Sequence, residues 1–217
     1  MSNDTACFCG SGKKHADCHG HIRCDSLVAK LYRLQARCGA ANGSACRSPL
    51  RSQCFLVSEA EFVQLLDDML RHWTAEEIRQ VVDRSWECRR YLEAERPDIA
   101  EKAGGKTTPG ELASLNETAL PFPCVFLRGE DCAARRVRPL LCLGCGASID
   151  FVLLRYKDGV LVRRPAPLFY YFTLIFRDGV LPDNIPDAPF YRDMLTLSEA
   201  DYIEKLAEYA ELKTASF

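Results

Sequence analysis

Residues 58–95 decide the fold of this chain, and they read SEAEFVQLLDDMLRHWTAEEIRQVVDRSWECRRYLEAE. Two serine or threonine residues, Ser58 and Thr74, are each followed three positions later by a glutamate, which is the spacing of a capping box. Apolar residues then recur at helical spacing after each box. The stretch therefore predicts two successive helices, the second of which runs to about Glu95, just before Pro97.

The segments outside this pair predict a mainly helical α+β domain. Leucines at helical spacing indicate a helix over 23–37, and an amphipathic pattern indicates a closing helix over 198–212. A short helix is expected over 109–116, and the apolar run 168–176 is expected to be a buried strand or helix. The Asp-Gly pair within 149–162 predicts a short β-hairpin.

Composition and charge exclude several classes of partner. The chain has 217 residues, 47% of them hydrophobic, and a net charge of -2, which predicts no affinity for nucleic acid or an anionic membrane. The first residues lack a basic region followed by an apolar run, so we expect no signal peptide and a cytoplasmic location. The longest apolar run, 168–176, is too short for the roughly 20 residues that span a bilayer.

Twelve cysteines in such a chain need an explanation. The cytosol keeps thiols reduced, so clustered cysteines indicate metal ligands rather than a disulfide framework. Two isolated cysteines, Cys24 and Cys88, fall on predicted helices, where we expect small buried apolar side chains. The others form three groups: Cys7, Cys9 and Cys18; Cys38, Cys46 and Cys54; and Cys124, Cys132, Cys142 and Cys145.

The first group predicts a zinc knuckle at the N-terminus. Zinc prefers four tetrahedral ligands, with thiolate sulfur and imidazole nitrogen favoured. Gly10-Ser11-Gly12 allows the chain to reverse, and Lys13 and Lys14 can offset the net negative charge of the loaded site. So short a segment buries no core, so the metal must supply its folding energy, about 10 kcal/mol or more. The predicted ligands are Cys7, Cys9, Cys18 and His19.

These residues, CFCGSGKKHADCHG from Cys7, resemble the SEC-C motif. The motif has the pattern C-x-C-G-S-G-K-K-x-x-x-C followed by Cys or His, so His19 is an accepted variant, and Phe8 stands where the family often has proline. The resemblance implies zinc at the four ligands and a docking role toward a partner protein or the ribosome. It predicts a knuckle over 1–22, followed by a cysteine-cluster domain over 23–217.

The last group predicts a second metal site. It has the spacing Cys124-x7-Cys132-x9-Cys142-x2-Cys145. A redox C-x-x-C would follow a strand and open a helix, whereas this one follows Pro139, so the pattern favours metal. Four thiolates suit either zinc or an iron–sulfur cluster, and both readings stay open.

The surrounding residues resemble the YkgJ-like cysteine-cluster family, which is described as zinc- or iron-chelating. The resemblance rests on Cys54-Phe-Leu-Val-Ser58-Glu-Ala-Glu61, on Cys124-Val-Phe-Leu127, and on Arg138-Pro139 before the third cysteine of the late group. It covers residues 38–146 and leaves 147–217 as a C-terminal segment. It implies that five cysteines converge, with Cys38 and Cys145 as candidate completions: Cys46, Cys54, Cys124, Cys132 and Cys142.

Three functions compete on this evidence. The first is a non-enzymatic metal-binding protein with a docking knuckle. The second is a metal-cluster-dependent modifying enzyme, by analogy with protein lysine methylases that carry a similar cluster, although the sequence has no recognisable catalytic or cofactor motif. The third is a thiol-based redox or metal sensor. The basic residues Arg135, Arg136 and Arg138 either bind phosphate or offset the charge of the nearby thiolates.

Overall fold

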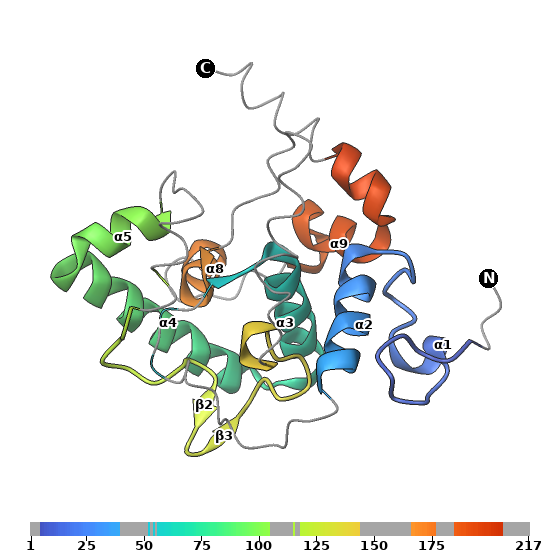
Figure 1. Ribbon diagram of the computed structural model, residues 1–217, viewed down its shortest axis with the longest axis horizontal. Helices are drawn as coiled ribbons and strands as arrows, with labels where there is room; N and C mark the ends of the chain where they lie inside the picture. Colours follow the sequence, from blue (N-terminus) through green and yellow to red (C-terminus); the bar gives the residue numbers. More distant parts are fainter. Residues whose placement is uncertain are drawn as a thin grey trace.

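Helices make up most of the described chain, as predicted (Figure 1). The computed structural model describes residues 5–39, 52, 54, 56–104, 115, 118–143, 166–176 and 185–205. Its α-helices are α1 (His15–Cys18), α2 (Leu27–Gly39), α3 (Glu59–His72), α4 (Ala75–Glu95), α5 (Pro97–Gly104), α8 (Leu168–Ile175) and α9 (Pro189–Thr196). The shorter elements are the strands β1 (Leu56–Val57), β2 (Leu127–Arg128), β3 (Asp131–Cys132) and β4 (Ala166–Pro167), with 3-10 turns η2 (Leu141–Leu143) and η5 (Ile185–Asp187).

Both capping boxes form, and they begin α3 and α4 as predicted. The Ser58 hydroxyl accepts a hydrogen bond from the Glu61 amide at 3.2 Å, and the Ser58 amide donates to the Glu61 carboxylate at 2.7 Å. Thr74 and Glu77 repeat the arrangement at 3.2 and 2.8 Å. Each box satisfies two amides that the first helical turn would leave without partners.

One helix begins later than predicted, and Pro97 begins a further helix that was not predicted. The helix expected over 23–37 begins at Leu27, because the Ser26 hydroxyl caps it by accepting from the Ala29 amide at 3.2 Å. Cys24 consequently lies in the preceding turn and not on a helix. Pro97 ends α4 as expected, but it also occupies the first position of α5, where a missing amide hydrogen costs nothing.

The strands form two small antiparallel pairs. Strand β1 pairs with β4, with Leu56 opposite Pro167, and β2 pairs with β3 around a turn in which Gly129 has a φ of 60°. Of the two alternatives for the run 168–176, the structure has the helix, α8. The predicted hairpin at 149–162 lies outside the described residues.

The core is centred on stacked and edge-to-face aromatic rings between α3, α8 and the segment before β2. Phe62 lies 4.8 Å from Tyr171 and 5.1 Å from Phe172, measured between ring centroids, and Phe126 lies 5.8 Å from Phe172. Helix α8 packs along α4, while α9 packs on α2 and α3 (Figure 1). Within the described chain, no helix is long and apolar enough to cross a membrane.

Buried hydrogen bonds fasten the cysteine-rich segment 118–143 to the helices. Gln35 of α2 and Gln64 of α3 exchange amide hydrogen bonds of 2.7 and 2.6 Å, and Gln35 also donates to the Arg138 carbonyl at 2.9 Å. The other oxygen of the Glu61 carboxylate accepts from the Leu140 amide at 2.8 Å. The segment itself consists of turns and short elements, as predicted for 119–146, of which residues 144–146 lie outside the described chain.

The predicted closing helix is present in part. Residues 199–205 are helical, and 206–212 lie outside the described chain. The same holds for the short helix expected over 109–116, of which only Leu115 is described, in helical conformation.

Candidate metal centre

A glycine-rich turn places the first two cysteines of the knuckle. The Cys7 amide donates to the Lys13 carbonyl at 2.8 Å, which closes the turn, and Ala6 forms an antiparallel bridge with Lys14. Gly10 and Gly12 have φ values of 77° and 74°, a conformation that other residues rarely adopt. The Gly-Ser-Gly sequence therefore reverses the chain as expected.

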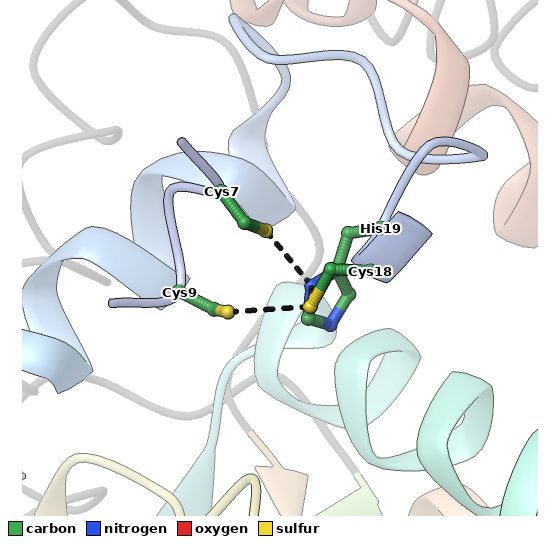
Figure 2. Close-up of side chains that lie close together, drawn as sticks. All are labelled: Cys7, Cys9, Cys18 and His19. Carbon is green, nitrogen blue, oxygen red and sulfur yellow. Dashed lines mark hydrogen bonds between the residues drawn. The ribbon is translucent and has the colours of Figure 1, made fainter. Parts of the chain in front are cut away.

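The single helical turn α1 returns the other two candidate ligands. It begins right after the bridge, and the His19 amide caps it by donating to the His15 carbonyl at 2.9 Å. Cys18 ends the turn and His19 follows it, so both side chains point back toward Cys7 and Cys9 (Figure 2).

The four predicted ligands of the knuckle converge. Their ligand atoms all lie within 4.8 Å of one another. The Nδ1 atom of His19 lies 3.2 Å from the sulfurs of both Cys7 and Cys18, and the sulfurs of Cys9 and Cys18 lie 3.6 Å apart (Figure 2). In the part of the chain that the structure describes, this is the one group of three or more such side chains close enough to hold a metal ion.

These separations fit a tetrahedral zinc ion. With Zn–S bonds of about 2.3 Å and Zn–N bonds of about 2.0 Å, ligand atoms should lie roughly 3.5–3.8 Å apart. The observed pairs, at 3.2 to 3.6 Å, are close to these values. The donor set of three sulfurs and one imidazole nitrogen is also one that zinc prefers, and it leaves no open position for a substrate.

The surroundings tune the protonation of the ligands. Burial lowers the pKa of His19 to about 4, and His21 adds to the effect, so the imidazole is neutral at pH 7 as a ligand must be. Burial raises the pKa of Cys7 to about 12. Burial would also raise the pKa of Cys9, but hydrogen bonds from the side chain and backbone of Ser11 outweigh it and the pKa is lowered. A bound cation would have to displace the Cys7 proton.

The knuckle is seated on α2 by aromatic contacts. Tyr32 of α2 lies under the knuckle, with its ring 4.6 Å from the His19 ring and 5.5 Å from that of Phe8. Phe8 therefore does more than replace the proline common in the SEC-C motif, because it packs the knuckle against the domain. His15 also contacts Phe8, at 5.2 Å, and its Nδ1 lies 4.0 Å from the Cys7 sulfur.

A buried carboxylate anchors the exit of the knuckle. Asp67 of α3 accepts hydrogen bonds from His21 at 2.9 Å, from Tyr191 of α9 at 2.6 Å and from Arg71 at 2.9 Å. His21 is half-buried in this contact, and His15 is half-buried beside Phe8. Sequence reasoning missed Asp67.

The second predicted cysteine set is described only in part. Cys54 is buried. Cys124, Cys132 and Cys142 are half-buried along the segment 118–143. Cys46 and Cys145 lie outside the described residues, as does the side chain of Cys38. Among the described side chains, these cysteines form no group of three within metal-binding distance, so their role as ligands stays a prediction.

Neither isolated cysteine has a position that indicates metal binding. Cys88 is buried on α4, as expected, and burial raises its pKa to about 11. Cys24 lies in the turn before α2, where it is half-buried.

Comparison with known proteins identifies the knuckle and little else. No curated protein and no solved structure matches the chain. The family model of the SEC-C motif matches residues 5–20, the segment that carries the four converging side chains. Residues 5–20 are thus a SEC-C motif with a Cys₃His cluster that is compatible with metal binding.

Proposed function

We propose that the chain is a zinc-binding protein whose N-terminal knuckle is a docking module. The observation that carries the proposal is the convergence of Cys7, Cys9, Cys18 and His19 within 4.8 Å. Three thiolates and an imidazole select zinc over the hard, oxygen-preferring cations. Four protein ligands close the coordination shell, which favours a structural ion over a catalytic one.

The docking role rests on the SEC-C motif and on the exposure of its turn. Residues 10–14 are exposed, while Cys7 and Phe8 on the other side of the loop face the domain. A zinc ion would hold this turn in one conformation, so that a partner protein or a ribosome would meet a pre-formed surface.

Metal analysis of single variants tests the zinc site. Cys9→Ser removes one thiolate ligand and should abolish one zinc equivalent, because the metal must supply the folding energy of the short knuckle and binds more weakly without this thiolate. Cys24→Ser is the matched control, since Cys24 lies five residues beyond the cluster and takes no part in it. Full zinc content in purified Cys9→Ser would contradict the proposed site.

Co-sedimentation tests the docking role. The zinc-loaded chain should pellet with purified ribosomes, and Cys9→Ser should lose this property while Cys24→Ser keeps it. Equal pelleting of all three proteins would show that the knuckle does not mediate the contact. If even the wild-type chain stays in the supernatant, the ribosome is not the partner.

We further propose that the second cysteine set binds zinc or an iron–sulfur cluster, in keeping with the resemblance to YkgJ-like proteins. Support comes from the backbone: the Cys54 amide donates to the Thr118 carbonyl at 2.9 Å, and the Leu120 amide donates to the Ser52 carbonyl at 2.7 Å. Cys54, the last member of the early group, therefore lies beside the start of the segment that carries the late group. A metal held by both groups would staple together the helices α3, α4 and α5 that separate them.

Metal content also tests the second site independently of the first. Cys9→Ser should retain the second metal, and Cys132→Ser should lose it while the knuckle keeps its zinc. Visible absorbance in the purified chain would identify an iron–sulfur cluster, and a colourless protein with a second zinc equivalent would identify zinc. A chain that holds only the knuckle's zinc would refute the second site.

A further inference from the structure

A cavity of about 710 Å³ lies between the knuckle, α2, the end of α3 and the segment 135–143. The candidate ligands Cys9, Cys18 and His19 form one of its walls. Its volume is in the range of pockets that hold small organic ligands, about 300–1,000 Å³. The four candidate ligands already fill the coordination shell of the proposed metal ion, so the metal site does not use this cavity.

The cavity is lined by more cations than anions. Lys13 of the knuckle faces it from one side, and Arg135, Arg136 and Arg138 face it from the other. Among the residues that the structure describes, the carboxylates in its wall are those of Asp17 and Asp68. The cations therefore outnumber these carboxylates even after the single net negative charge of a zinc-loaded Cys₃His site is included.

Three of these cations are available to a ligand. Lys13, Arg135 and Arg136 are exposed, and none of them makes an ion pair with any residue that the structure describes. The positive charge of Arg136 interacts with Asp68, but the Asp68 carboxylate already accepts a hydrogen bond from the Trp73 indole at 3.2 Å. Carboxylates among the described residues therefore leave most of the positive charge at the rim of the cavity without a neutralising partner.

The remaining wall is suited to an organic group. Tyr32 and Ala36 of α2 and Val137 and Leu143 of the opposite segment contribute apolar surface. The backbone of this segment is fixed at the cavity by the hydrogen bond from Gln35 to the Arg138 carbonyl. Arg135 and Arg136, which precede this point, are therefore presented from an anchored chain and not from a free loop.

We propose that this cavity binds a small organic phosphate of about nucleotide size, with its phosphate groups on Lys13, Arg135 and Arg136 and its organic part on the apolar wall. Guanidinium groups form paired, charge-assisted hydrogen bonds with phosphate oxygens, which explains two adjacent arginines at the rim. The ligand would bridge the knuckle and the cysteine-rich segment. This proposal is independent of the docking role, because it concerns the inner side of the knuckle.

Calorimetric titration of the zinc-loaded chain tests the proposal with ADP, pyrophosphate and adenosine as probes. ADP should bind, pyrophosphate should bind more weakly, and adenosine should show no measurable binding. The double variant Arg135→Ala/Arg136→Ala should weaken ADP binding by about tenfold or more, the effect of losing charge-assisted hydrogen bonds. Both arginines are exposed, so the variant should keep the wild-type zinc content and circular dichroism.

The matched control is Arg79→Ala/Arg90→Ala, which removes two exposed arginines of α4 and so makes the same change in net charge. It should bind ADP like the wild type. The proposal is overturned if neither ADP nor pyrophosphate binds, or if both double variants weaken ADP binding equally. Binding of adenosine as tight as that of ADP would show that the basic rim is not used. Equal affinity for ADP and pyrophosphate would remove the organic part of the proposal.

Discussion

One carboxylate, that of Asp67, joins three parts of the molecule. It lies in the middle of α3, its side chain is 2% exposed, and its hydrogen-bond donors come from the knuckle exit, from α3 itself and from α9. A buried carboxylate is costly unless such donors compensate for the lost water. Here burial would raise the pKa of Asp67, but the bonds from His21 and Tyr191 outweigh it and the pKa is lowered.

Replacing Asp67 by asparagine should destabilise the fold by about 2–3 kcal/mol at pH 7, because the buried donors lose a charged acceptor. The folded-state pKa of Asp67 is below its unfolded value of about 3.9, so its contribution is present above that pH and is lost as the pH falls through the folded pKa. His21, Arg71, Tyr191 and Asp68 are the titratable or charged groups around it. Urea unfolding at several pH values should show the difference from wild type shrinking below about pH 4.

The control for this experiment is Asp83→Asn, which changes an exposed carboxylate of α4. It should leave the stability near the wild-type value at every pH. A deficit of Asp67→Asn that stays constant down to pH 2 would mean that its effect is steric and not electrostatic.

The candidate ligands could be found from the sequence, whereas Asp67 could not. Cys7, Cys9, Cys18 and His19 lie within one short segment, so their spacing alone predicts that they meet. The shortest hydrogen bond to Asp67 comes from Tyr191, which is 124 positions away in the sequence. Nothing in the local pattern distinguishes a carboxylate with such a partner from one that faces water.

At the level of elements, the two capping boxes offer a matched comparison. Glu61 and Glu77 make the same bonds to their own helix, but Glu61 is buried and uses its second oxygen to accept from the Leu140 amide, while Glu77 pairs with Arg128 at the surface. The first box thus begins a helix and also positions the cysteine-rich segment.

Glu61→Gln should therefore cost more than Glu77→Gln. A glutamine side chain keeps one acceptor oxygen, but its NH2 end cannot accept a hydrogen bond, so in the buried box it leaves a backbone amide of Ser58 or Leu140 without a partner, at about 1–3 kcal/mol. Water can replace the lost acceptor at Glu77. Equal losses of unfolding free energy in denaturant titrations of the two variants would show that the bond to Leu140 adds no stability.

Helices with local signals were predictable, and those without them were not. The boxes fixed the start of α3 and α4, and the expected helix at 23–37 was displaced because Ser26 and not an earlier residue caps it. Helix α5 was missed because Pro97 was interpreted only as a stop, although proline is equally favoured at a helix start. The pairing of β1 with β4 has no local signal, since the two strands are far apart in the sequence.

At the scale of the whole molecule, the knuckle is packed against the domain. The Arg23 amide donates to the Leu195 carbonyl at 2.8 Å, and Ile22, next to it, is fully buried. Together with Tyr32 and Asp67, these contacts give the metal cluster a seat formed by α2, α3 and α9. We therefore expect metal occupancy to be coupled to packing well outside the first twenty residues.

Removal of the metal should consequently lower the stability of the whole chain. Chelation with EDTA should reduce the melting temperature by about 10 °C or more, with a single transition in circular dichroism, because part of the binding energy of the ion stabilises the packed seat. Tyr32→Ala should make the melting temperature less sensitive to EDTA, whereas Tyr91→Ala, on α4 and remote from the knuckle, should not. A chain that melts at the same temperature with and without the chelator would support a separate knuckle over residues 1–22.

The seat of the knuckle also has a consequence for biosynthesis. The motif at residues 5–20 is synthesised before α9 and its candidate ligands are local, so we expect that a nascent chain can load a metal early. The α9 side of the seat comes much later, and the ion pair of Lys30 with Glu199 joins residues 169 positions apart. We therefore expect one flank of the knuckle to stay uncovered in a nascent chain until α9, which contains Tyr191, has been synthesised.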